Sequence, residues 1–239
     1  MLILGIDTSS DICSVGLSKK ENFVGEINIK LKRRHSERLL PIIDKLFEET
    51  NFKISDLEGI IVTDGPGSFT GLRIGLSTVQ AFKQSLKVPV YSVSSLEYMA
   101  YLLKKHYDNK LLVPTIDARN KRVYTALFES TATDKFVKRI KKDQAIDIKD
   151  LIDIFTNFQQ EKIVFGSGVD SYYHEFKEKT LGDTVLLENI NNNSGYNLAV
   201  LGFKYISKGN ETDFLDLTPK YLKKPQAKIN FEKKYLQED

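Results

Sequence analysis

Hydrophobic residues near the start of the chain follow the two patterns typical of strands in a β-sheet. Residues 2–6 are almost all apolar, which predicts a strand buried on both faces. Cys13, Val15 and Leu17 then alternate with small or polar residues, which predicts a second strand after a short polar turn. A third strand is expected near residues 22–29. The chain therefore begins with an antiparallel three-stranded unit.

The following segment changes to the spacing of amphipathic helices. Apolar side chains recur at helical intervals just after the basic stretch, with Pro41 near the helix start; they are Leu39, Leu40, Ile43, Leu46 and Phe47. Strands and helices are then expected to alternate, with a strand at 60–62, a helix at 70–86 and a strand at 88–93.

The opening pattern returns in the second half of the chain. The segments MLILGID (residues 1–7) and LLVPTID (residues 111–117) align without a gap, and an alternating second strand follows each. A strand near 135–140, a helix near 148–158, a strand at 163–165 and a helix near 198–206 then echo the first half. Chance similarity between two apolar strands is the alternative, but the repeated order of elements favours a duplication.

A duplicated unit of this kind predicts an α/β protein of two lobes, each a mixed sheet flanked by helices. We place the N-terminal lobe at residues 1–108 and the C-terminal lobe at residues 109–222. Residues 223–239 are charged and only weakly periodic, so a mobile, peripheral tail is expected there.

Composition excludes several classes of protein. The 239 residues include 35 basic and 32 acidic side chains, a net charge of +3, which is too balanced to indicate a nucleic-acid binder. Cys13 is the single cysteine, so no internal disulfide can form. No apolar stretch approaches the ~20 residues that span a bilayer. We expect a cytoplasmic protein without membrane contact.

The stretch TDGPGSFTGLRIGLSTVQ (residues 63–80) has the outline of a phosphate-binding loop between a strand and a helix. Its spacings do not fit one. A Walker loop needs a second glycine five residues after the first, followed by lysine, but Thr70 and Leu72 stand at that distance and no lysine follows. The dinucleotide fingerprint fails because Thr70 stands where its third glycine belongs. Pro66 also removes a backbone N–H that could donate to phosphate. Instead, we expect a tight turn, with Ser68 or Thr70 capping the helix.

Within that helix, Gly71, Gly75 and Thr78 fall on one face with almost no side-chain bulk. Each interior glycine costs roughly 1 kcal/mol of helix propensity, so another backbone is expected to pack closely there. That backbone could belong to the chain's own sheet or first helix, or to a second subunit; the pattern alone leaves the two alternatives even.

Other candidates for chemistry are few. His35, His106 and His174 have no metal-binding spacing, and a buried, inert thiol is the favoured interpretation of Cys13. Asp7, beside Thr8 and Ser9, could hold a metal-bound phosphate between two lobes, or could simply cap its own turn. For Asp117 the capping interpretation is favoured. The basic clusters at 30–34, 119–122 and 138–142 are expected to be solvated surface.

Several segments resemble the bacterial TsaB family, formerly called YeaZ. The longest match is GPGSFTGLRIG (residues 65–75); others are ILGIDTSSDICSVGL (3–17), RHSERLLPII (34–43), VSSLEYMA (93–100), DARNKRVYTALF (117–128) and PKYLKK (219–224). The resemblance covers the chain from residue 3 to about residue 224. Asp64, before the Gly-Pro-Gly turn, is ordinary variation within the pattern.

The resemblance implies the actin/sugar-kinase/Hsp70-like fold, built from two ribonuclease-H-like lobes. It also implies a non-catalytic scaffold that binds the catalytic subunit TsaD and, with the ATPase TsaE, supports formation of threonylcarbamoyladenosine in tRNA. Contact with tRNA is then indirect, and ATP or ADP and metal belong to the partner subunits, with no cofactor in this chain.

Members of the family form homodimers through the two N-lobe helices that engage TsaD. Carried over to this sequence, the expected interface comprises Leu39, Leu40, Ile43, Gly71, Arg73, Gly75 and Thr78, which favours the subunit alternative for the glycine face. Asp7, Thr8 and Ser9 form a turn that could lie near a nucleotide. The competing hypothesis is a phosphotransferase or ATPase of the same fold that acts through Asp7; a glycoprotein peptidase lacks a zinc or nucleophile constellation.

Overall fold

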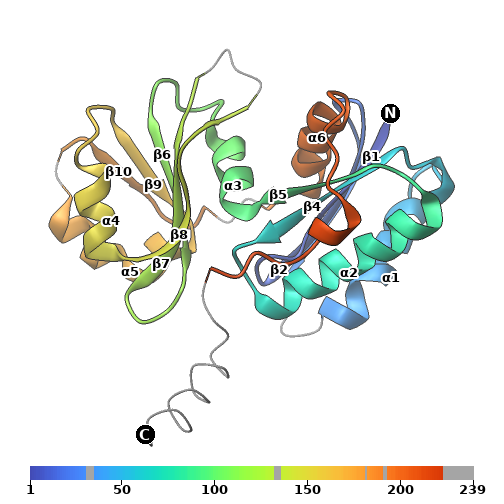
Figure 1. The fold of residues 1–239 in the computed structure, drawn as a ribbon, viewed down its shortest axis with the longest axis horizontal. Coiled ribbons are helices and arrows are strands. Elements are labelled where there is room, and N and C mark those ends of the chain that lie inside the picture. The colour runs from blue at the N-terminus through green and yellow to red at the C-terminus, as the bar shows by residue number, and fades with distance from the viewer. Residues whose placement is uncertain (31–34, 132–135, 181, 191–192, 223–239) are drawn as a thin grey trace, which may run out of the picture.

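The computed structural model describes residues 1–30, 35–131, 136–180, 182–190 and 193–222, and the account below concerns these. The chain forms two lobes, each built on a five-stranded mixed sheet (Figure 1). The expected tail at 223–239 lies outside the described residues, as does Arg34 of the RHSERLLPII motif.

The first sheet has the strand order β3-β2-β1-β4-β5. Its strands are β1 (Leu2–Asp7), β2 (Ile12–Lys19), β3 (Asn22–Lys30), β4 (Gly59–Gly65) and β5 (Val90–Ser94). The first three pair antiparallel, whereas β4 pairs parallel with both β1 and β5. The three-stranded opening unit is thus confirmed.

The second sheet has the strand order β10-β9-β6-β7-β8, which repeats the topology of the first sheet when it is written in the opposite direction, β8-β7-β6-β9-β10. Its strands are β6 (Leu111–Asp117), β7 (Arg122–Glu129), β8 (Lys138–Asp147), β9 (Lys162–Phe165) and β10 (Thr184–Leu187). Each strand takes the same place and direction as its counterpart in the first sheet. The duplication read from the two Ile-Asp strands therefore extends to both whole sheets.

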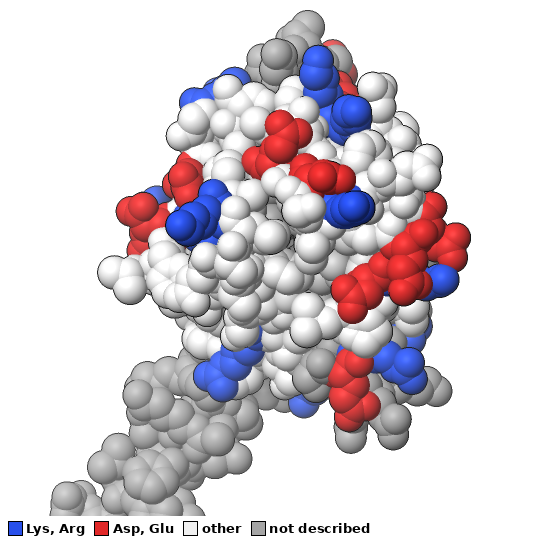
Figure 2. All heavy atoms as spheres, turned by 90° about the vertical axis from the view of Figure 1, so that its right-hand side faces the viewer, with Lys and Arg blue, Asp and Glu red and all other residues white. Residues whose placement is uncertain are grey.

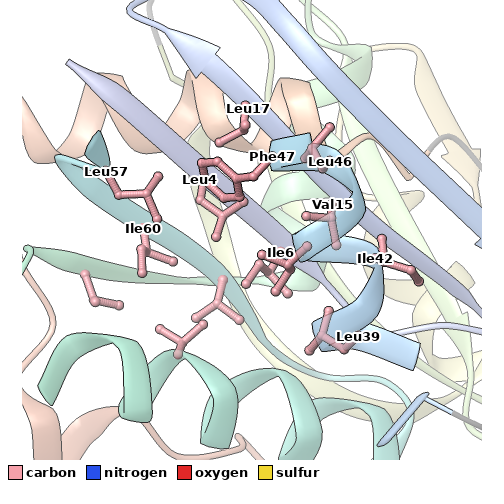
Figure 3. Packing of buried hydrophobic residues seen from close by; sticks show 14 of the residues in the cluster. Leu4, Ile6, Val15, Leu17, Leu39, Ile42, Leu46, Phe47, Leu57 and Ile60 are labelled. Carbon is pink, nitrogen blue, oxygen red and sulfur yellow. The ribbon is translucent and has the colours of Figure 1, made fainter. Parts of the chain in front are cut away.

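Helices α1 (His35–Glu48) and α2 (Phe69–Leu86) lie side by side on one face of the first sheet. Leu4 and Ile6 of β1 pair in register with Leu17 and Val15 of β2, and all four face these helices (Figure 3). Ile3 belongs to a separate cluster on the other face. Strand β1 is apolar throughout because both of its faces are covered.

The helix on that other face is α6 (Gly195–Ile206), which corrects the lobe boundary expected from sequence. Residues 109–222 were all assigned to the C-terminal lobe, but α6 packs on β1, β2 and β4 of the first sheet. The approach is close enough that a Cβ on Gly5 or Gly16 would overlap the backbone at the start of α6. Burial of Ile3 and Ile61 against α6 explains why the chain returns to the first lobe.

The segment after α6 also remains on the first lobe. A short 3-10 turn (Phe214–Asp216) leads to Leu217, which is buried in the core beneath α2. Gln80 of α2 donates to the Leu217 carbonyl at 2.9 Å, and the Lys220 N–H donates to the Asp64 carbonyl at 2.8 Å. The C-terminal part of the described chain therefore lies along α2 as a strap, defined here as residues 212–221.

In the second lobe, α4 (Ile148–Phe155) and α5 (Ser167–Lys179) pack together, against β8 and β6 respectively. Helix α3 (Ser95–Leu103) lies between the lobes, where it contacts strands of both sheets (Figure 1). Arg139 of β8 reaches Glu97 of α3 at 2.8 Å and also pairs with Asp143. Helix α3 and this ion-pair cluster connect the two lobes.

Candidate functional site

The glycine-rich turn between β4 and α2 rests on the turn between β1 and β2. The Ser68 N–H donates to the Ser9 carbonyl at 2.7 Å, and a Cβ on Gly67 would overlap that same carbonyl. The Ser68 hydroxyl accepts from the Gly71 N–H, so one of the two expected helix caps is confirmed. The glycine turn thus packs onto Ser9 instead of leaving that turn open to a phosphate.

The glycine face of α2 points inward, so its assignment to a subunit interface is wrong for Gly71 and Gly75. Both are buried, and a Cβ on either would overlap Thr8, at its carbonyl for Gly71 and at its hydroxyl for Gly75. The Thr8 hydroxyl donates to the Gly71 carbonyl at 2.8 Å. The backbone that packs there is the chain's own β1–β2 turn, which was the other alternative.

The remaining expected interface residues divide between core and surface. Leu39 and Ile43 are buried in the core of the N-terminal lobe, because they occupy the side of α1 that faces the sheet. Leu40 is 49% exposed, Arg73 is exposed, and Thr78 is half-buried. Only the last three can meet a partner directly.

The outward face of α2 is itself lined with small side chains. Ser77, Ala81 and Ser85 follow one another at intervals of four residues, and all three are exposed. Leu40 and Pro41 are exposed on α1, the helix that contacts α2. We name these five residues the docking face, after the role that we propose for them below. The sequence shows this i, i+4, i+8 spacing of small residues, but the expected interface was placed on the glycines of the opposite side of the helix instead.

An exposed aromatic group stands at the start of α2, next to the docking face. Phe69 stacks on Tyr221 of the strap with ring centroids 4.7 Å apart. The Arg73 guanidinium lies 3.9 Å from the Phe69 ring centroid, and its Nε donates to the Tyr221 hydroxyl at 2.7 Å. The strap therefore fixes the orientation of Arg73 on the helix surface. Charged groups elsewhere on this lobe leave uncharged surface between them, as the end-on view shows (Figure 2).

Asp7 lies buried at the end of β1 and lines the cleft between the lobes. Its Oδ1 accepts from the Ser9 N–H at 2.9 Å and from the Thr63 hydroxyl at 2.7 Å. Burial raises the pKa of Asp7 above the ordinary value of 3.8, although the hydrogen bonds from Ser9 and Thr63 act in the opposite direction. Thr63 was not foreseen as its partner, because the two residues meet only when β1 and β4 pair.

This raised pKa predicts that Asp7→Asn stabilises the protein near neutral pH. The folded state binds the Asp7 proton more tightly than the unfolded state does, so the associated stability is present below the unfolded pKa of about 4 and is lost as pH rises through the folded pKa. An asparagine stays uncharged and keeps an acceptor for Ser9 and Thr63.

Thermal melts from pH 4 to pH 8 should therefore show a higher Tm for Asp7→Asn at pH 7 and convergence with the unmodified protein at the acid end. Asp153→Asn, at an exposed carboxylate on α4, is the matched control. A lower Tm for Asp7→Asn at pH 7 would contradict the assigned environment.

Other predicted candidates prove structural. The Asp117 Oδ1 accepts from the Arg119 N–H at 2.7 Å, so this carboxylate caps its own turn, and it also accepts from the Tyr172 hydroxyl at 2.9 Å. Cys13 is fully buried, and burial raises the pKa of its thiol to about 12, which keeps it protonated and inert. Among the described residues, no group of three or more His, Cys, Asp or Glu side chains could hold a metal ion.

Comparisons with known proteins place this geometry in a family. Residues 20–231 match the sequence profile described as TsaD, tRNA N6-adenosine threonylcarbamoyltransferase. The tRNA threonylcarbamoyladenosine biosynthesis protein TsaB of Bacillus subtilis (strain 168) is 30% identical over 233 residues, which cover 97% of this chain and 98% of that protein. The chain belongs to the TsaB family. The Haemophilus influenzae TsaB protein is 28% identical over 93% of this chain and 94% of its own length.

Solved structures agree on the fold of this TsaB-family chain. YeaZ from Pseudomonas aeruginosa superposes with a TM-score of 0.76 at 23% sequence identity, over 92% of this chain and 99% of that one. A ROK hexokinase from Thermus thermophilus gives a TM-score of 0.51 at 9% identity, over 87% of this chain. The two-lobed actin/sugar-kinase/Hsp70-like fold expected from the resemblance is thereby confirmed.

One structural contact of this chain was not expected from its sequence. Asp64, read there as ordinary variation, is fully buried; its Oδ2 accepts from the Ser92 hydroxyl at 2.9 Å and pairs with the Lys220 ammonium at 2.8 Å. Asp64 thus binds the strap to β4. No spacing signal could have linked residues so far apart in the chain.

No helix in the described part is long and apolar enough to cross a membrane.

Proposed function

We propose that this chain is a non-catalytic subunit of the bacterial machinery that forms threonylcarbamoyladenosine in tRNA. In this proposal it binds the catalytic subunit TsaD, together with the ATPase TsaE, and its contact with tRNA is indirect. Family membership supports the pathway, since the B. subtilis and H. influenzae relatives carry the name of that biosynthesis. The proposed site of action is the cytoplasm.

The observation that carries the scaffold role is the docking face of α1 and α2. Ser77, Ala81 and Ser85 present little side-chain bulk, so a partner helix can approach closely, and Leu40 supplies an exposed apolar anchor. The Arg73 side chain, which Phe69 and Tyr221 hold in place, is on the same helix and can contact the partner. The same face would pair two copies of this chain when TsaD is absent.

The absence of catalysis in this proposal rests on the packing around Asp7. At the turn that would cradle a phosphate, the Ser9 N–H donates to Asp7 and the Ser68 N–H donates to the Ser9 carbonyl, so both donors are already used. Nothing at this turn supports the competing hypothesis of an Asp7-dependent phosphotransferase or ATPase. We propose that nucleotide and metal bind to the partner subunits and that this chain carries neither.

A reconstituted tRNA modification assay tests the proposal. Purified TsaD, TsaE and the enzyme that makes the threonylcarbamoyl-adenylate donor are combined with unmodified tRNA and ATP, with and without this chain, and the modified nucleoside is quantified by mass spectrometry. We expect product only when the chain is present, and none when the chain is supplied without TsaD. Equal product in its absence would refute the proposed function.

A further inference from the structure

The cleft between the two lobes has a volume of about 1080 Å³ and is lined by side chains from both of them. One of its walls is apolar. Met99 and Leu103 come from α3, Ile116 from β6, Phe165 from β9, and Ile190 from the segment after β10. Sites for small ligands are commonly concave, largely apolar and situated between domains, with a few convergent polar groups. The cleft has this form.

Two buried polar groups line the cleft together with these apolar side chains. Asp7 is 2% exposed and supplies a carboxylate. Ser95, at the first position of α3, is also 2% exposed and lines the cleft. Its hydroxyl has no hydrogen-bond partner among the described residues. A buried hydroxyl without a partner is costly, and a ligand that binds beside it removes the cost.

The charges around the cleft disfavour an anionic ligand. Three carboxylates line it, from Asp7, Asp11 and Asp117. The cations that line it in the described chain are Lys30 and Arg119; the Lys30 ammonium pairs with Asp11 at 3.1 Å and its side chain is 72% exposed, and Arg119 is exposed as well. Both of these described cations are thus exposed, whereas the Asp7 carboxylate is buried.

We propose that the cleft binds a small amphipathic cation, a protonated amine attached to an apolar ring or chain. The ammonium group donates to the Asp7 carboxylate and the Ser95 hydroxyl, and the apolar part packs against Met99 and Phe165. Binding of this cation would favour the ionised form of Asp7, whose pKa burial otherwise raises. The site is separate from the docking face, so this proposal does not depend on the proposed function.

The methionine composition permits a direct test. The chain has two methionines, Met1 and Met99, and only the second lines the cleft. Selective 13C labelling of methionine methyl groups therefore gives one resonance that reports on the cleft and one that serves as an internal control. The probes are 2-phenylethylamine, 2-phenylethanol and 3-phenylpropanoate, which share a phenyl ring but differ in head-group charge, together with Mg·ATP.

We expect 2-phenylethylamine to shift the Met99 resonance saturably and to leave Met1 unchanged, with weaker binding of the alcohol and none of the carboxylate or Mg·ATP. Asp7→Asn should weaken amine binding by about tenfold or more, the usual effect of losing a charge-assisted hydrogen bond. Asp153→Asn is the control and should not change it. The proposal is overturned if the amine gives no saturable shift, if the carboxylate or Mg·ATP binds as well, or if Asp7→Asn has no effect.

Discussion

Gly71→Ala is expected to lower the free energy of unfolding by about 2–3 kcal/mol. The added Cβ would overlap the Thr8 carbonyl, which is backbone and cannot move aside as the end of a side chain could. The hydrogen bond from the Thr8 hydroxyl to the Gly71 carbonyl would be strained as well. Alanine gains about 1 kcal/mol of helix propensity, but overlap with backbone in a packed site outweighs that gain.

Urea unfolding followed by circular dichroism measures this loss, and a thermal melt should show a Tm lower by roughly 2–4 °C for each kcal/mol lost. Gly182→Ala is the matched control, because a Cβ there has nothing within 4 Å. An unchanged stability for Gly71→Ala, together with loss of subunit binding, would show that the glycine face points outward after all.

Ser77→Arg is expected to weaken binding to TsaD strongly while leaving the fold intact. Ser77 is exposed in the middle of the docking face, and arginine is a good helix former, so the isolated chain should keep its stability to within about 0.5 kcal/mol. In the complex, the long charged side chain would occupy the space that a partner helix needs and would lose its hydration. A loss of about 2–3 kcal/mol, or roughly 30-fold to 150-fold in Kd, is expected for such a change at an interface centre.

Isothermal titration against TsaD measures the affinity. Sedimentation velocity of the chain alone tests the proposed homodimer, which the same substitution should dissociate. Ser171→Arg makes the identical change at an exposed serine of α5 and should alter neither. Normal binding by Ser77→Arg would move the interface away from α2.

The elements of each lobe could be predicted because their burial patterns are local. Strand β1 is apolar at consecutive positions since helices cover both of its faces, and β2 alternates in register with it. The position of α6 could not be predicted. Its helical pattern indicates that one face is buried. The surface that buries this face includes Ile3 and Ile61, which are far away in the sequence.

The orientation of α2 shows where a signal was present and was misjudged. Gly71 and Gly75 precede Leu72 and Leu76, so the bare stripe adjoins the side of the helix that the leucines carry into the core. That adjacency indicated an inward face. The cleft, by contrast, brings Asp7 to the same site as Ser95 and Phe165 only through the stacking of the two lobes, which no local pattern records.

The most direct test of the scaffold role compares Asp7→Asn with Ser77→Arg in the reconstituted tRNA modification assay, at equal concentrations of this chain. If the chain acts by docking, Asp7→Asn should support threonylcarbamoyladenosine formation at the unmodified rate. Ser77→Arg should reduce it by nearly the factor lost in TsaD affinity when TsaD is kept below the Kd of the unmodified complex. Loss of product with Asp7→Asn and full product with Ser77→Arg would contradict the account, because activity would then depend on the carboxylate and not on the outward face of α2.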